Sequence, residues 1–345
     1  MDNLEAPGRD EVYLWPFAVG MAVINCVGLL GNVSVLAAVW RSEKLRLACT
    51  YLMAALAFAD AFTNVYCLQV ATLVMAPRFS WLLNRDCFVA SAVGLFFMNA
   101  ESCLVWLVGV DRCLVMKLRQ SYNRWRPATY TSCMVAPAVA YSLVLILIGA
   151  VGSSKFVRVF VCMPPTAYHG SGLMTWVAAN NGLCLAVLAT YGYALYLARA
   201  NLHTAGGGGN GGGPESNSSN RRLLHSLAIV GAVYCATWAV TNVCAVVNQT
   251  LLRRRPFWSF HVNVYMGFLI AINASCNAYV YCWRSRRWRR AILDEAWRPL
   301  LPCLFQSGPK AGSTTLFVTR KSNRTITQRS PQVARKEEGP AEGRL

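Results

Sequence analysis

The chain has 345 residues, of which 55% are hydrophobic and only 14% are charged, and its formal net charge is +18. A typical soluble domain carries about 25% charged residues, so the composition excludes an ordinary soluble domain. The apolar residues are also clustered, since residues 12–40 and 128–152 contain no Lys, Arg, Asp or Glu. Segments of that length match a helix that crosses about 30 Å of hydrocarbon. The sequence therefore predicts a membrane protein.

The basic residues outnumber the acidic ones by 33 to 15. In a soluble protein this excess would favour nucleic-acid binding. Here the basic residues lie between and after the apolar segments, so we expect a lipid bilayer and no nucleic acid as partner. The few histidines are far apart in the sequence, which argues against a multi-histidine di-iron hydroxylase or desaturase. We expect no metal centre and no enzyme activity.

Seven apolar segments predict an all-α membrane protein, a seven-transmembrane helix bundle with a short amphipathic cytoplasmic helix. The expected spans cover residues 12–40, 48–76, 86–116, 128–151, 171–198, 223–251 and 257–283. Residues 1–11 are acidic and polar and lack the basic flank of a signal peptide, so the first span is expected to serve as its own anchor. No internal repeat is visible.

The charges of the connecting segments predict the orientation. The segments that follow the first, third, fifth and seventh spans carry 24 Lys and Arg residues, and the opposite set carries 8. Because basic residues accumulate on the cytoplasmic side, the N-terminus is expected outside and the C-terminus inside. The expected location is the plasma membrane.

Three segments on the expected inner side are polar. Residues 205–220 are rich in Gly, Asn and Ser and predict a flexible linker. Residues 284–298 interleave tryptophan and isoleucine with arginines, a pattern typical of an interfacial helix along the inner leaflet. Residues 299–345 predict a disordered cytoplasmic tail, and the sequence leaves open whether Cys303 in this tail is palmitoylated.

Three acids, Asp60, Glu101 and Asp111, lie inside predicted spans. A charge at membrane depth costs at least about 2.5–3.5 kcal/mol, so such residues usually face the bundle interior and serve function. Arg112 follows Asp111, and Cys87 lies 25 residues before Arg112, a rise of about 37 Å along a helix. One helix can therefore place a cysteine outside and an Asp–Arg pair inside. Cys162, near the next outer loop, is a candidate disulfide partner for Cys87.

Four further stretches and this Asp–Arg pair together resemble a rhodopsin-like (class A) G-protein-coupled receptor. With the pair, which lies in DRC at 111–113, the four stretches are GNVSV at 31–35, LAFAD at 56–60, the degenerate YCATWAV at 234–240 and NAYVY at 277–281. They are similar to GNxxV, LAxAD, DRY, FxxCWxP and NPxxY of that family, with the prolines of the last two absent. The block KLRLAC at 44–49 is similar to the nematode serpentine receptor class sx chemoreceptors.

The resemblance implies roles for individual residues. It implies G-protein coupling at Asp111, Arg112, Cys113 and Tyr122, and helix packing at Asn32. It implies a polar or sodium pocket at Asp60, Glu101, Asn273 and Asn277. It implies a conformational switch at Trp238, Tyr234 and Tyr281, and a ligand region at Gly94, Leu95 and Met98. Simpler interpretations stay open. Asp111 and Arg112 could be an interfacial snorkelling pair, and Trp238 could face lipid. Glu101 could be neutral, and it, Asn273 and Asn277 could be polar packing residues.

Single positions exclude two receptor subfamilies. Receptors for biogenic amines carry an Asp where this chain has Gly94, and opsins carry a retinal-binding Lys where it has Ala271. The resemblance therefore implies a receptor for an unidentified extracellular small molecule or short peptide, chemosensory or orphan, that activates a heterotrimeric G protein. No cofactor is expected apart from a bound sodium ion. The alternative is a multi-span transporter or ion-conducting chemoreceptor, which would need repeats or a polar pore.

Overall fold

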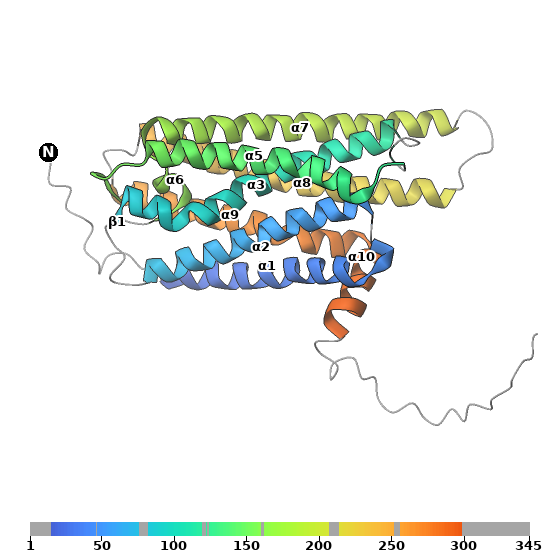
Figure 1. The fold of residues 1–345 in the computed structure, drawn as a ribbon, viewed down its shortest axis with the longest axis horizontal. Helices are drawn as coiled ribbons and strands as arrows, with labels where there is room; N and C mark the ends of the chain where they lie inside the picture. The colour runs from blue at the N-terminus through green and yellow to red at the C-terminus, as the bar shows by residue number, and fades with distance from the viewer. Residues whose placement is uncertain are drawn as a thin grey trace, which may run out of the picture. The chain divides into compact units, whose positions relative to one another are not determined.

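The computed structural model describes residues 15–45, 47–75, 82–118, 122, 124–159, 162–206, 214–251 and 256–298. Within this part of the chain, seven helices are long and apolar enough to cross a membrane. They are α1 (Trp15–Arg41), α2 (Ala48–Met75), α3 (Asn84–Lys117), α5 (Pro127–Gly152), α7 (Gly170–Gly206), α8 (Pro214–Thr250) and α9 (Pro256–Arg284). The long helices run alongside one another as a bundle (Figure 1). The predicted seven-helix fold is confirmed.

Five of the seven helices begin and end within three residues of the predicted spans, whereas α7 and α8 are longer. Helix α7 continues to Gly206 and α8 begins at Pro214, so the prediction of a linker over residues 205–220 was wrong at both of its ends. Once a helix has formed in the membrane, each added residue gains a hydrogen bond without a new nucleation cost. Proline at the first helical position fits this extension, because its missing N–H would have no partner there anyway.

The connection between α5 and α7 is more ordered than the sequence indicated. Strand β2 (Arg158–Val159) pairs antiparallel with β1 (Leu82–Leu83), and a short helix, α6 (Pro164–Ala167), follows. The Cys87–Cys162 disulfide joins this connection to the first turn of α3, with the two Cα atoms 5.4 Å apart. The disulfide predicted from the sequence is confirmed.

The amphipathic segment after α9 is also confirmed, in two parts. Helix α10 (Arg286–Ala291) is followed by a π-helical turn over Ile292–Trp297. Trp288 is buried and stacks on Tyr281 of α9, with ring centroids 6.0 Å apart. On the other side, Arg41 Nη1 donates a hydrogen bond to the carbonyl oxygen of Glu295 at 2.6 Å. The segment is therefore attached to both α1 and α9.

Helix α3 lies at the centre of the bundle. The most apolar 18-residue stretch of α3 is 72% buried, whereas the corresponding stretch of α5 is only 22% buried. The stretch of α5 is nevertheless the more hydrophobic of the two. Residues on α3 are thus the ones that can contact several other helices. The predicted N-terminal segment 1–11 and the tail 299–345, with Cys303, lie outside the described residues.

We predict that the Cys87–Cys162 bond stabilises the protein by about 2–4 kcal/mol, since it closes a large loop. Cys87→Ser, Cys162→Ser and the double variant should all lower the melting temperature of the purified protein by the same amount. Cys26→Ser, at an exposed free cysteine, is the matched control and should leave it unchanged. Additive losses in the double variant, or free thiols at both positions in non-reduced peptide maps, would contradict the bond.

Candidate functional site

An ion pair lies at the C-terminal end of α3, opposite the Cys87–Cys162 disulfide. From the loop charges we expect this end to face the cytoplasm, and we call it the inner end and the disulfide end the outer end. Arg112 Nη2 is 3.2 Å from Asp111 Oδ2, and both side chains are buried. Removing two charges from water is costly unless they are paired and further hydrogen bonds satisfy them. The adjacent residues of the predicted coupling motif therefore do form a pair.

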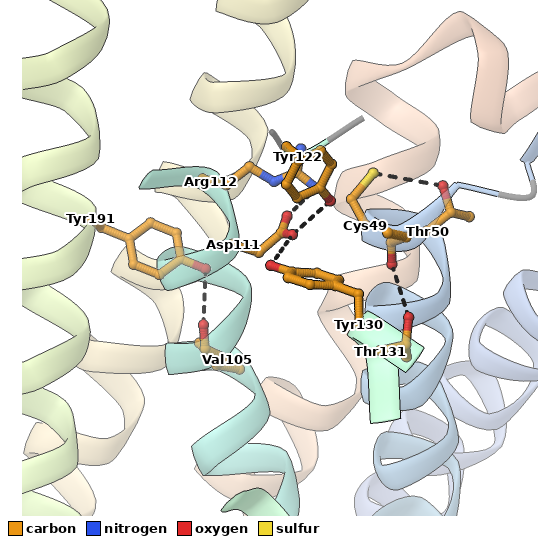
Figure 2. A network of polar contacts seen from close by, with 10 residues as sticks. Cys49, Thr50, Val105, Asp111, Arg112, Tyr122, Tyr130, Thr131 and Tyr191 are labelled. Carbon is orange, nitrogen blue, oxygen red and sulfur yellow. Dashed lines mark hydrogen bonds and ion pairs between the residues drawn. The ribbon is translucent and has the colours of Figure 1, made fainter. Parts of the chain in front are cut away.

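Two tyrosines complete the environment of Asp111. The hydroxyl groups of Tyr122 and Tyr130 each donate a hydrogen bond to Asp111 Oδ1 at 2.9 Å, and Figure 2 shows both phenols pointing at this carboxylate. Burial and the adjacent carboxylate raise the pKa of Tyr122 in the inner loop, so its phenol stays protonated and able to donate. Tyr122 was predicted from the resemblance. Tyr130 was missed, since a single tyrosine in the first turn of an apolar helix gives no distinctive signal.

Neighbouring helices close around this inner site. Cys113 Sγ contacts the carbonyl oxygen of Thr190 on α7 at 3.6 Å, and Tyr191 OH donates to the carbonyl oxygen of Val105 at 3.2 Å. The Cys49 thiol at the start of α2 interacts with the Arg112 guanidinium. The inner end of α3 is therefore held by α2, α5 and α7, and a movement of any of them changes the surroundings of Arg112 (Figure 2).

A second polar cluster lies deeper in the bundle. Asn277 Nδ2 donates to Asp60 Oδ2 at 2.8 Å, and Asn273 Nδ2 donates to Glu101 Oε1 at 2.5 Å. All four side chains are at least 96% buried. The structure thus brings together the four residues predicted as a polar pocket, from α2, α3 and α9. In the described part of the chain, Asp60 Oδ1 and Glu101 Oε2 have no hydrogen-bond partner.

Asn32 joins α1 to the same region. Its Nδ2 atom donates to the carbonyl oxygen of Ala274 on α9 at 2.9 Å. Asn64 on α2 reaches the same carbonyl at 3.4 Å and accepts a bond from Ser275 Oγ at 2.9 Å. These bonds across three helices match the packing role predicted for Asn32. Asn64 and Ser275 were not singled out in the sequence.

The predicted switch residues are in contact with other aromatic side chains. Trp238 is 2% exposed, so the interpretation that it faces lipid was wrong. Its ring lies 6.0 Å from that of Tyr234 and makes an edge contact with Trp176 of α7 at 5.9 Å. Trp176 is fully buried and was missed, because tryptophans are also common on lipid-facing surfaces. Tyr281 instead contacts Trp288, as described above.

The predicted ligand region is packed rather than open. Gly94, Leu95 and Met98 are all buried. A Cβ atom on Gly94 would lie 2.2 Å from Cγ of Tyr66. The ring of Tyr66 therefore occupies the space that an aspartate would need there. Among the residues that the structure describes, no group of three or more His, Cys, Asp or Glu could hold a metal ion.

Seven membrane-crossing helices, a disulfide at the outer end of α3 and a buried Asp–Arg pair at its inner end define a rhodopsin-like G-protein-coupled receptor. The family described as "Serpentine type 7TM GPCR chemoreceptor Srsx" matches residues 25–296. This covers most of the chain, and the protein belongs to that family. It is a G-protein-coupled receptor, and the transporter alternative receives no support from this membership.

Curated relatives are receptors of the same class. The chain is 23% identical over 305 residues to the high-affinity lysophosphatidic acid receptor of Xenopus laevis, covering 80% of this chain and 81% of that protein. It is 23% identical over 318 residues to "Probable G-protein coupled receptor 45" of Homo sapiens, covering 85% and 84%. A shorter match, 27% identical over 154 residues, links it to the mouse 5-hydroxytryptamine receptor 2C, covering 44% and 33%.

The packing at Gly94 leads to a prediction. In Gly94→Ala the added methyl group would meet the Cβ and Cγ atoms of Tyr66, which cannot move without shifting the whole ring. We expect a loss of about 1–3 kcal/mol in stability, as in other overpacked cores. The measurement is the melting temperature of the purified receptor. Gly182→Ala, where a Cβ meets nothing within 4 Å, is the control, and an equal response of both variants would contradict this packing.

Proposed function

We propose that the protein lies in the plasma membrane with the inner end of α3 in the cytoplasm and that it couples an extracellular ligand to a heterotrimeric G protein. The observation that carries this proposal is the buried Asp111–Arg112 pair with its two tyrosine donors. The loop charges support the orientation, with the N-terminus outside. The protein acts as a receptor and not as an enzyme.

Coupling needs two arrangements of the inner end. In the arrangement of the structure, Asp111 holds Arg112 and the tyrosines hold Asp111. A ligand that binds a second arrangement better shifts the population toward it. In that second arrangement Arg112 separates from Asp111 and contacts the G protein, as the resemblance of residues 111–113 to DRY implies.

The ligand is proposed only by class. The Xenopus laevis relative is named as a receptor for lysophosphatidic acid, but 23% identity does not carry that ligand to this chain. An amine is disfavoured, because Gly94 lies under the ring of Tyr66 and supplies no carboxylate. The proposed ligand is a small molecule or a short peptide that reaches the bundle from outside.

Substitutions in the inner site test the coupling. Asp111→Asn removes the anion that holds Arg112, so we expect ligand-free nucleotide exchange to rise several-fold. Tyr130→Phe removes one of the hydrogen bonds to Asp111, worth about 1.5–3 kcal/mol for a charged acceptor, and we expect a smaller rise. Arg112→Ala should abolish exchange. The assay is nucleotide exchange on purified G proteins at matched receptor amounts.

The unmodified receptor should also show basal exchange, because residues 220–224 near the inner end of α8 hold two arginines and no acid that could hold Arg112. The control variant is Tyr196→Phe on the exposed face of α7, which should behave as wild type. Exchange by Arg112→Ala equal to that of wild type would overturn the coupling role. Ion flux in liposomes without nucleotide exchange would restore the transporter alternative.

We further propose that Asp60 and Glu101 hold a sodium ion or share a proton. The residues fit a cation, since one oxygen of each buried carboxylate lacks a hydrogen-bond partner among the described residues. Two neighbouring carboxylates in a water-poor site cannot both stay ionised without a positive charge. Asn273 and Asn277 orient the two carboxylates through their other oxygens.

This pocket predicts a dependence on sodium and pH. A cation that binds the arrangement seen here stabilises it, so sodium should lower ligand-free exchange in wild type relative to choline at equal ionic strength. Glu101→Gln removes one of the two charges and should blunt both the sodium and the pH response. Ser102→Ala, at the adjacent residue of α3, is the control. Identical sodium and pH responses in wild type and Glu101→Gln would contradict the pocket.

A further inference from the structure

The outer connection between α5 and α7 is held rigidly against the bundle. The Cys87–Cys162 disulfide fixes its middle, and the Asn84 side chain binds both its start, through Ser154, and the residues that follow Cys162. Asn84 Nδ2 donates to the carbonyl oxygens of Thr166 at 2.8 Å and Ala167 at 3.0 Å. The backbone position of the next residue, Tyr168, is therefore set by the hydrogen bonds to the two residues just before it.

Tyr168 points inward, although it belongs to a connection between helices. It is 1% exposed, and its hydroxyl oxygen accepts a hydrogen bond from Asn99 Nδ2 of α3 at 3.2 Å. Its ring stacks on Trp176 of α7 with centroids 5.4 Å apart and packs edge-on against Phe88 at 5.7 Å. The residue thus has the contacts of a bound aromatic ligand, with one polar and two aromatic partners.

Gly149 of α5 makes room for this ring. A Cβ atom at this position would lie 2.6 Å from Tyr168 Cε1 and 2.4 Å from Phe88 Cε2. Distances of that size cannot be accommodated without moving one of the rings. The site around Tyr168 is therefore formed by α3, α5 and α7 together, and a glycine is needed on one wall.

The contacts of Tyr168 continue to the predicted switch. Trp176 Nε1 donates to Asn99 Oδ1 at 3.0 Å, so Asn99 binds Tyr168 and Trp176 at the same time. Trp176 then contacts Trp238 of α8. A side chain of the outer connection is in this way linked by direct contacts to α8. In the same structure the ion pair between Asp111 and Arg112 is formed, and we call this arrangement the closed state.

We infer that Tyr168 is an internal ligand that occupies a phenol-binding site formed by Asn99, Trp176 and Gly149 and holds the receptor in its closed state. An activating external ligand reaches this site only by displacing Tyr168. The site selects for an aromatic ring that stacks on Trp176 and carries an oxygen able to accept a hydrogen bond from Asn99. The inference that Tyr168 holds the closed state rests on the proposed function, whereas the inference that Tyr168 occupies a phenol-binding site does not.

The test removes Tyr168 and returns its side chain as a separate molecule. Tyr168→Gly leaves a space of the shape of 4-methylphenol. We expect this variant to have a lower melting temperature and about fivefold or more higher ligand-free exchange than wild type, the lower end of typical couplings between sites. Adding 4-methylphenol should raise the melting temperature and lower the exchange toward wild type. Toluene, which lacks the oxygen for Asn99, should do less.

Three further variants separate this role from simple misfolding. Gly149→Ala narrows the site and should also raise ligand-free exchange, whereas Gly192→Ala, where a Cβ meets nothing within 4 Å, should not. Phe156→Ala lies in the same outer connection but is 94% exposed, so it should behave as wild type. Wild type should show no stabilisation by 4-methylphenol at the concentrations that stabilise Tyr168→Gly.

The outcomes distinguish a failure of the proposed function from a failure of the Tyr168 site. If no form of the receptor exchanges nucleotide, wild type included, the proposed function fails, while stabilisation of Tyr168→Gly by 4-methylphenol still supports the internal ligand. Unchanged or lower exchange in Tyr168→Gly would overturn its holding of the closed state. Equal effects of 4-methylphenol and toluene, or none on the melting temperature, would overturn the phenol-binding site.

Discussion

The paired charges of Asp111 and Arg112 must be kept out of the lipid at the inner end of α3, and the surrounding helices are arranged to do so. The two residues pair with each other, two tyrosines donate to the carboxylate, and α7 closes one side. An unpaired buried charge would cost several kcal/mol, so this environment is specific. The same cost fits the proposed coupling, in which the pair opens only when a G protein offers Arg112 new acceptors.

Three sets of contacts follow the central helix from outside to inside. Tyr168 of the outer connection meets Asn99 near the middle of the helix, Glu101 meets Asn273 two residues further on, and Asp111 meets Tyr130 at the inner end. Each set joins α3 to at least one other element. A change of rotation or tilt of α3 alters all three sets at once, which gives a physical route for the proposed coupling between an outer ligand and a G protein.

The missing helix prolines do not prevent this arrangement. Helix α8 has no proline near Trp238, and this predicted switch residue still lies between Tyr234 and Trp176. The polar pocket is likewise formed although alanine replaces proline in NAYVY, since Asn277 still reaches Asp60. The side chains of the family motifs are thus positioned by helix packing, and backbone kinks are not required for their contacts.

The sequence by itself determined the seven spans, the amphipathic segment, the disulfide and most residues of the inner and middle clusters. Span length follows from the thickness of the bilayer, and a charge inside a span must face the protein. Only the tertiary structure decided that Tyr130 completes the surroundings of Asp111, that Asn99, Trp176 and Tyr168 contact one another, and that α8 begins at Pro214. In a membrane both the lipid-facing and the buried side of a helix are apolar, so hydropathy does not determine helix rotation. The partners of a buried side chain depend on that rotation.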